Sequence, residues 1–179
     1  MLIFRKYILA LTIIFACLSL SAQERANLSA KSLNEDLKEL SEKLGFEICA
    51  QDTVHLSLFE TAADWLGVRY RWGGNSRTGV DCSGFTRVLY SLLFDKTIDH
   101  SSNSLSKTVP VKISSPDKLK PGDMVFFATS KKHKKINHVG VYLKDGFFVH
   151  ASSAKKKVLV STLLDGFYKK AWRMGGRYN

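Results

Sequence analysis

The sequence predicts an α+β domain in which helices come first and an antiparallel sheet follows. Before Pro121-Gly122, apolar residues recur at the spacing of amphipathic helices. After this turn signal they fall in short runs rich in β-branched and aromatic residues, which are typical of strands. Helices and strands segregated along a chain in this way indicate the α+β class, and residues 23–179 are enough for a single hydrophobic core.

The first 22 residues are typical of a secretory signal peptide. Arg5 and Lys6 precede the apolar run 7–15, and small residues lead to a cleavage site near Ala22. The run is too short to favour a permanent membrane span. The alternatives are a retained membrane anchor and lipidation of Cys17, whose surroundings loosely resemble a lipoprotein cleavage box. The sequence therefore predicts export to the periplasm or cell envelope.

Residues 23–54 are expected to form an N-terminal helical extension, and residues 55–179 the main domain. Leucines recur at helical spacing in residues 27–45, which predicts an amphipathic helix laid on the domain. A second helix is expected over residues 56–66, with Gly67 as its C-cap.

The strands are expected in the second half of the chain. The segment 97–119 is polar and rich in serine, so we expect it to cross between the helical and strand halves without regular structure. The expected strands cover residues 123–127, 138–143, 147–151, 158–160 and 172–174.

The stretch Asp81-Cys82-Ser83-Gly84-Phe85 places a cysteine where a loop becomes a helix. Asp81 is the expected N-cap, and the unpaired N–H groups of the first turn stabilise a thiolate at Cys82. Most lone cysteines are small buried hydrophobes, so this position alone does not establish a nucleophile. The buried face of the helix is expected to consist of Phe85, Val88, Leu89, Leu92 and Leu93.

Cys49 and Cys82 are the two cysteines that remain after signal removal. An oxidising compartment would allow them to pair. A disulfide would consume the nucleophile, so we expect both thiols to be free and Cys49 to be buried.

A cysteine nucleophile needs a base, and the chain offers five histidines. His55 and His100, at the edges of elements, and His133, inside a lysine run, are expected to be solvated surface residues. His138 and His150 instead occupy the two strands of one hairpin.

The register of this hairpin brings its two histidines together. If residues 144–146 form a three-residue loop, Gly140 faces His150 and His138 is the diagonal neighbour of His150, roughly 7–8 Å away at the backbone. We interpret His138 as the general base for Cys82, and His150 as the residue that fixes its tautomer and stabilises the imidazolium. Two unrelated histidines on an exposed sheet face are the alternative. The predicted second face carries His138, Gly140, Tyr142, Phe148, His150 and Ser152, and the first face is entirely apolar.

Five motifs occur in a fixed order between residues 56 and 177. They are Tyr70-Arg71-Trp72-Gly73-Gly74, Asp81-Cys82-Ser83-Gly84, and the segments 121–127, 138–142 and 148–151. In this order they resemble the motifs of the NlpC-like cell-wall peptidases, which are bacterial cysteine peptidases with a papain-like fold.

The resemblance implies a catalytic triad of Cys82, His138 and His150. It further implies that Tyr70 helps form the oxyanion site and that Asp81 and Ser83 bind substrate. The chain departs from the family pattern at Arg69, where many members have proline, and at His100, where many have an arginine-led motif. Both departures border the expected cleft and bear on substrate preference.

The function that follows is an exported hydrolase that cuts the peptide stems of peptidoglycan. The resemblance favours a D,L-endopeptidase acting on γ-D-glutamyl–diamino acid bonds, with a D,D-endopeptidase on D-Ala–diaminopimelate cross-links as the alternative. A wall-binding protein without activity, and an acyltransferase or amidase on other substrates, are further alternatives. No metal or cofactor is expected, because a catalytic zinc normally takes a different ligand set. We expect a monomer.

The chain is basic, with a formal net charge of +11 that falls by two, to +9, when Arg5 and Lys6 leave with the signal peptide. Lysines cluster in residues 131–135 and 155–157. A small, basic, exported protein suggests contact with an anionic cell-wall polymer or a membrane surface. Nucleic acid is not expected, because no aromatic residues interleave with the lysines. A solvated surface that aids solubility is the alternative.

Overall fold

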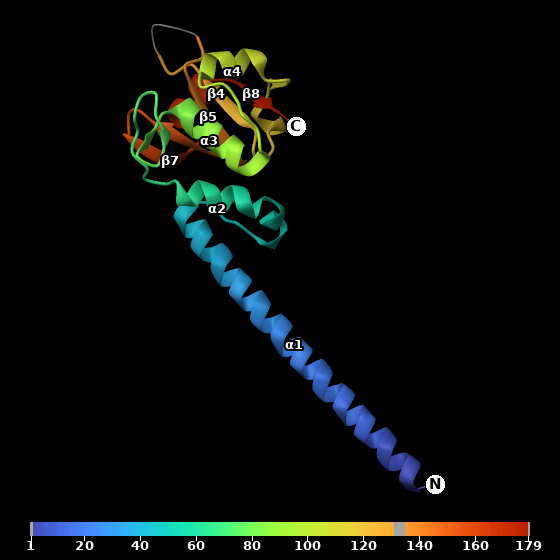
Figure 1. Ribbon diagram of the computed structural model, residues 1–179. Coiled ribbons are helices and arrows are strands. Elements are labelled where there is room, and N and C mark those ends of the chain that lie inside the picture. Colours follow the sequence, from blue (N-terminus) through green and yellow to red (C-terminus); the bar gives the residue numbers. More distant parts are fainter. Residues whose placement is uncertain (1, 131–134, 179) are drawn as a thin grey trace.

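The computed structural model describes residues 2–130 and 135–178, with side chains from residue 23 onward. Its centre is an antiparallel sheet of six strands in the order β3-β8-β4-β5-β6-β7, and α3 packs on one face of it (Figure 1). The strands of this sheet are β3 (Val111–Ile113), β4 (Met124–Phe127), β5 (His138–Lys144), β6 (Phe147–Ser152), β7 (Lys157–Thr162) and β8 (Trp172–Arg177).

The helices come mainly from the first half of the chain. They are α1 (Leu2–Leu44), α2 (Leu56–Asp64), α3 (Cys82–Phe94), α4 (Ser102–Thr108) and α5 (Gly166–Ala171), with 3-10 helices η1 (Ala50–His55) and η2 (Pro116–Lys118). A two-stranded ribbon, β1 (Asn75–Ser76) and β2 (Gly79–Val80), precedes α3. The mixed helix and antiparallel-sheet architecture confirms the predicted α+β class.

All five predicted strands are present, and three short elements, α4, β3 and η2, were missed in the segment 97–119. β3 is an edge strand of three residues, too short to show an alternating pattern, and it is held by pairing with β8. α4 begins at the N-cap Ser101, whose hydroxyl accepts the Ser104 N–H, and it buries Leu105. A serine N-cap ahead of one apolar residue was the only local signal for this helix.

α1 differs from the predicted helix in how much of it packs on the domain. The predicted segment 27–45 lies within α1, which ends at Leu44 before Gly45 with φ 77°. Leu37, Leu40 and Leu44 are buried, but Leu33 is 37% exposed, because the helix projects away from the domain (Figure 1). In the part of the chain that the structure describes, no helix is both long enough and apolar enough to cross a membrane.

The β5–β6 hairpin has the predicted pairs Val141–Val149 and Tyr142–Phe148. The predicted three-residue loop is wrong, because Lys144 pairs with Phe147 and the turn contains only Asp145 and Gly146, both with positive φ. Two positive φ values match a type I′ turn, and a bulge next to Tyr142 restores the register.

The two faces of the hairpin bury two separate groups of side chains. The predicted apolar face joins the larger core beneath α3, with Val139, Val141, Val149 and Ala151 fully buried. The other face is covered by α5 and belongs to a second cluster that contains Tyr142, Phe148 and Tyr168.

The buried face of α3 is rotated from the predicted one. Phe85 and Leu89 are fully buried as predicted, but Leu92 is 63% exposed. Thr86 and Tyr90 take the inner positions because their hydroxyls find backbone acceptors there, at Cys82 and Gly122 respectively.

The residues after α1 are tied to the sheet through Asp52. Its carboxylate accepts hydrogen bonds from Cys49 N–H at 2.9 Å and from Lys144 Nζ of β5 at 2.5 Å. Partial burial raises the pKa of Asp52, but the hydrogen bonds from Cys49 and Lys144 outweigh it and lower the pKa to about 2. The ionised carboxylate is therefore stabilised by folding.

We expect Asp52→Asn to lower the free energy of unfolding by about 2 kcal/mol at neutral pH, because Lys144 loses its hydrogen-bonded carboxylate and keeps only the longer contact with Asp145 at 3.8 Å. Since the folded pKa lies below the usual 3.8, the difference from wild type is full above about pH 4 and narrows as the pH falls towards 2. Urea unfolding of wild type and variant at several pH values measures this difference in the free energy of unfolding. Asp36→Asn, which removes an exposed carboxylate of α1, is the matched control.

Candidate active site

Asp81 organises the start of α3. Its Oδ1 accepts the Gly84 N–H at 2.7 Å and the Ser83 hydroxyl at 3.1 Å, and its Oδ2 accepts the Gly73 N–H at 2.8 Å. His100 Nε2 lies 3.0 Å from Oδ1. A carboxylate only accepts, so this nitrogen carries a proton. The carboxylate thus caps the helix, holds the preceding loop and positions His100.

Cys82 lies in the first turn of α3, beside a cavity of about 230 Å³. The cavity is formed by the loop before α3, the start of α3, the start of α4 and the residue before β5. Its lining consists of Tyr70, Trp72, Gly73, Asp81, Cys82, Ser83, His100, Ser101, Ser102 and Asn137. It therefore contains the predicted nucleophile, oxyanion and binding residues.

Burial and, to a smaller extent, the negative charge of Asp81 raise the pKa of the Cys82 thiol to about 11. The backbone N–H groups of Val139, Ser83 and Cys82 act the other way, because they stabilise a thiolate. The thiol is therefore protonated at rest, and a base must remove its proton.

His138 and His150 form a direct pair at the start of β5 and the end of β6. His138 Nε2 lies 2.8 Å from His150 Nδ1, and the two rings are nearly perpendicular at 88°. Burial lowers the pKa of His138 to about 4, against a weaker opposing effect of Asp81. Burial, followed by the charge of His138, lowers the pKa of His150 well below its usual value. Both imidazoles are neutral at physiological pH.

Ser161 of β7 extends this pair. His150 Nε2 lies 3.0 Å from the Ser161 hydroxyl oxygen. If that nitrogen donates to Ser161, His150 Nδ1 is an acceptor, His138 Nε2 must donate to it, and the lone pair of His138 is on Nδ1. In this arrangement the nitrogen of His138 that is not bound to His150 is the basic one.

Tyr168 of α5 covers the histidine pair. Its ring stacks on His138 with centroids 6.0 Å apart and meets the edge of His150 at 5.0 Å. Burial raises the pKa of Tyr168, while a hydrogen bond with Ser152 lowers it and the charge of Cys82 raises it. The phenol is therefore a neutral, packed wall that keeps water from the imidazoles.

Gly140 makes room for His150, as the hairpin register predicts. A Cβ at this position would lie 2.8 Å from the Phe148 ring and 3.1 Å from the Cβ of His150. The contact with Phe148 is closer than side chains tolerate and the one with His150 is tight, so the diagonal histidine pair depends on a glycine here.

The prediction for His100 is wrong, because this residue is part of the cavity and pairs with Asp81. Its distance of 19 residues from Asp81 along the chain left no local signal for the contact. His55 is half-buried against Phe59, and His133 lies outside the described residues. Sequence reasoning also missed Ser161, Tyr168 and Asn137.

Cys49 and Cys82 are both free, as predicted, but Cys49 is only partly buried, so the prediction that it is buried was wrong. Among the described residues, no three His, Cys, Asp or Glu side chains are grouped closely enough to hold a metal ion.

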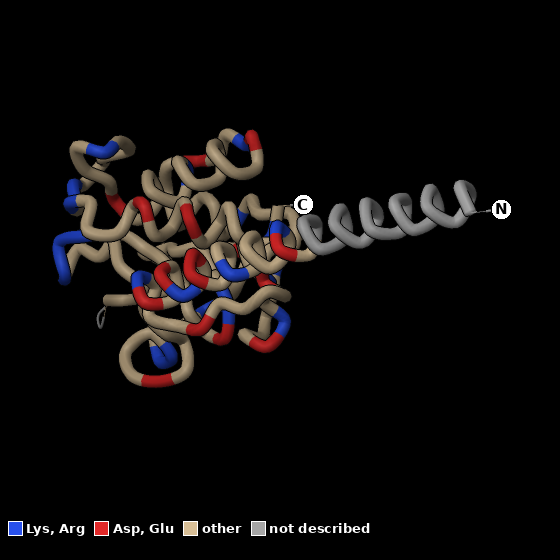
Figure 2. Tube along the Cα trace, turned by 90° about the horizontal axis from the view of Figure 1, so that it is seen from below, with Lys and Arg blue, Asp and Glu red and all other residues tan. Residues whose placement is uncertain are grey.

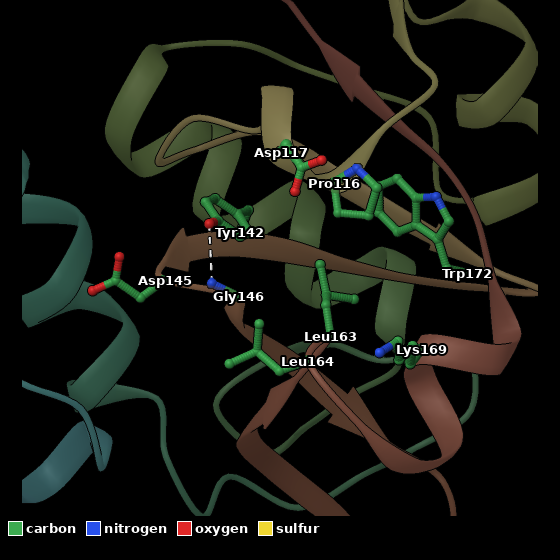
Figure 3. Close-up of a pocket in the computed structure, with 9 residues that line it drawn as sticks. All are labelled: Pro116, Asp117, Tyr142, Asp145, Gly146, Leu163, Leu164, Lys169 and Trp172. Atoms are coloured by element: carbon green, nitrogen blue, oxygen red, sulfur yellow. Dashed lines mark hydrogen bonds between the residues drawn. The ribbon is translucent and has the colours of Figure 1, made fainter.

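A larger cavity of about 420 Å³ lies elsewhere on the sheet, between Tyr142, Leu163, Lys169 and Trp172 (Figure 3). It contains none of the residues that the sequence singled out for chemistry. The smaller cavity at Cys82 is therefore the candidate active site.

A cysteine at a helix N-terminus beside histidines on an adjoining sheet defines the papain-like class of cysteine peptidases. Residues 67–177 match the NlpC/P60 family, and the chain belongs to it. A solved NlpC/P60 family protein from Bacillus cereus superposes with a TM-score of 0.60 and 31% identity, covering 68% of this chain and 39% of its own. The NlpC/p60 domain of the peptidoglycan hydrolase SagA gives a TM-score of 0.57 and 27% identity, over 68% of this chain and 97% of that domain.

Two sequence relatives come from Escherichia coli K12. The protein named murein DD-endopeptidase MepS/murein LD-carboxypeptidase is 29% identical over 85% of this chain and 82% of its own length. The probable endopeptidase NlpC is 36% identical over 66% of this chain and 74% of its own length. The γ-D-glutamyl-L-lysine dipeptidyl-peptidase of Bacillus subtilis is 34% identical over 63% of this chain but only 37% of its own length.

We expect Ser161→Ala to lower kcat about tenfold or more with little change in KM, because His150 loses the acceptor that orders the two imidazole tautomers. Ser161→Thr keeps a hydroxyl and should restore most of the rate. Steady-state kinetics measures both variants. The control is Ser114→Ala, which removes the hydroxyl of an exposed serine that does not line the cavity. A fall in kcat that threonine does not rescue would show that Ser161 matters only for packing.

Proposed function

We propose that this protein is a peptidoglycan hydrolase that cuts amide bonds in peptide stems, with Cys82 as nucleophile and His138 as general acid and base. The observation that carries the proposal is a helix-capped cysteine that lines a cavity, together with a buried histidine pair that begins at the residue before Val139, whose N–H reaches the Cys82 thiol. Relatives named for murein endopeptidase activity support the substrate class. The same substrate class supports action in the periplasm or cell envelope.

The reaction begins with transfer of the Cys82 proton to His138. The thiolate then attacks the carbonyl carbon of the stem amide, and the resulting oxyanion needs donors. His138 returns the proton to the leaving amine, which leaves an acyl group on Cys82. Water, deprotonated by His138, then hydrolyses this thioester and frees the enzyme. His150 stabilises the imidazolium of His138 in both half-reactions.

Tyr70 and the first N–H groups of α3 are the donors that we assign to the oxyanion. Burial raises the pKa of Tyr70, and the negative charges of Cys82 and Asp81 raise it further, so the phenol keeps its proton. A neutral phenol beside the nucleophile is able to donate to a developing negative charge. Ser83 and Asp81 line the adjoining part of the cavity. Asp81 contributes by holding the groups that donate hydrogen bonds to it in place.

The bond that we favour is γ-D-glutamyl to the diamino acid, the specificity implied by the family motifs and supported by the dipeptidyl-peptidase relative. A D,D-endopeptidase is the second candidate. One observation favours it: the DD-endopeptidase relative matches over 85% of this chain, including sequence before the family domain, and over most of its own length.

Incubation of the purified protein with peptidoglycan, followed by mass spectrometry of the products, tests the proposal. We expect new fragments with wild type and a loss of at least a hundredfold in their rate with Cys82→Ala, because the nucleophile is absent. Cys49→Ala is the matched control, since it removes the other described cysteine outside the cavity. Equal fragments from Cys82→Ala would refute the enzyme, and the fragment masses name the bond.

We also propose that residues 1–22 are removed during export. Sequencing the N-terminus of the exported protein should give Gln23 as the first residue, because the small residues at the end of the apolar run fit signal peptidase. A chain that begins at a lipidated Cys17, or one that remains uncut, would overturn this cleavage site.

A further inference from the structure

Five cations lie on two segments that pair with each other, and one of these segments borders the cleft through Tyr70. The cations form a surface that we call the basic rim, which consists of Arg69, Arg71, Lys155, Lys156 and Lys157. Every one of these side chains is exposed. In Figure 2, Lys and Arg segments are spread over the domain, and several of them lie on its left side.

Backbone pairing brings the two halves of the rim together. Arg69 bridges Lys157 in antiparallel fashion, and the Tyr70 N–H donates to the Lys156 carbonyl at 2.9 Å. The Val158 N–H donates to the Val68 carbonyl at 2.9 Å. The segment before the nucleophile therefore extends the sheet beyond β7, and the positions of the five charges are set by the fold.

The rim cations have no acidic partner among the residues that the structure describes. Cations elsewhere in the domain do have partners: Lys144 pairs with Asp52, Arg177 with Asp123 and Arg77 with Asp64. Neighbouring like charges repel each other, so the rim lowers the stability of the fold. A binding role for an anion accounts for a surface that folding alone disfavours.

The turn between β6 and β7 adds a second conformational cost. Lys156 adopts φ 60°, a left-handed conformation that disfavours residues with a Cβ. Glycine would fit this turn at lower cost. The chain instead places a lysine there, in the middle of the rim.

The rim is continuous with the candidate active site. Tyr70 lies between Arg69 and Arg71 in the chain and lines the cavity at Cys82. A polymer whose amide bond reaches Cys82 therefore carries its neighbouring groups past the rim. A flat membrane surface over the rim would cover the mouth of the cleft, which argues against a lipid partner.

We infer that the basic rim binds carboxylates on stem peptides of intact peptidoglycan, next to the stem that is being cut. This inference rests on the proposed function. A γ-linked glutamyl residue keeps its α-carboxylate free, so a polymer of such stems presents repeated negative charges. Attraction by the rim holds the enzyme on the polymer, and small soluble fragments, which have few carboxylates, gain less from it.

The test compares cleavage of intact sacculi with cleavage of a soluble single-stem muropeptide. We expect the variant with Lys155→Gln, Lys156→Gln and Lys157→Gln to lower the ratio of the two rates about tenfold at low salt. Raising the salt to about 0.5 M should lower the wild-type ratio towards that of the variant, because salt screens exposed charges. An unchanged ratio would overturn the inference.

The matched control is the variant with Lys112→Gln, Lys118→Gln and Lys120→Gln. It removes the same number of charges from exposed lysines near β3, at the opposite edge of the six-stranded sheet from β7. We expect its ratio to equal that of wild type. A similar fall in both variants would mean that net charge, and not the rim, attracts the polymer.

Co-sedimentation separates this inference from the proposed function, because it needs no cleavage. Wild type should bind sacculi freed of phosphate-bearing polymers, and the rim variant should bind several-fold less. Binding to vesicles of anionic phospholipid but not to these sacculi would overturn the inference. If the triple variant does not fold, Arg69→Gln with Arg71→Gln removes charge from the other half of the rim. If wild type binds sacculi normally but does not cleave them, only the proposed function is refuted.

Discussion

The carboxylate of Asp81 is the contact on which the rest of the site depends. Four donors surround its two oxygens, and they come from the loop before α3, from the first turn of α3 and from His100. Three of these donors share Oδ1, and one binds Oδ2. These hydrogen bonds fix the start of the helix and, with it, the direction of the Cys82 side chain.

The hydrogen bonds of Asp81 bear on how the cleft recognises a substrate. A ligand ammonium could contact Oδ1 only by displacing one of the three donors that this oxygen already has. His100 is one of these three donors, and its side chain is 25% exposed. The residue at this position therefore affects how much of the Asp81 charge a substrate experiences.

The hairpin supplies the other half of the site, and its strongest features were readable from the sequence. Strict alternation predicted which residues face the core, and the glycine opposite His150 predicted space for an imidazole. The number of residues in the turn was not predictable. A two-residue type I′ turn with a bulge and a three-residue loop give the same pairing of residues from Tyr142 towards the histidines. The shared register is the reason why the error at Lys144 left the histidine pair unaffected.

Contacts between distant segments limited the rest of the prediction. His100, Ser161 and Tyr168 carry no pattern of their own, and they matter only because α4, β7 and α5 pack beside the motifs. Leu92 followed the helical spacing yet faces solvent, since hydroxyl groups of Thr86 and Tyr90 found acceptors on the inner face. Periodicity describes one element at a time, whereas these outcomes depend on what lies opposite.

Negative charge lies beside the nucleophile, at Asp81, and positive charge lies on the basic rim. The reaction of Cys82 and the proposed binding of the polymer depend on these two charges respectively. The burial and negative neighbour that raise the pKa of Cys82 keep the thiol protonated until a substrate is in place. A carboxylate-rich polymer is repelled by the same negative neighbour, so it needs compensating positive charge close by. The rim provides that charge at the entrance rather than beside the sulfur, where a permanent cation would stabilise the thiolate and make it a weaker nucleophile. Because the cations that attract the polymer lie away from the sulfur, the protein can attract an anionic polymer while Cys82 and His138 both stay neutral at rest.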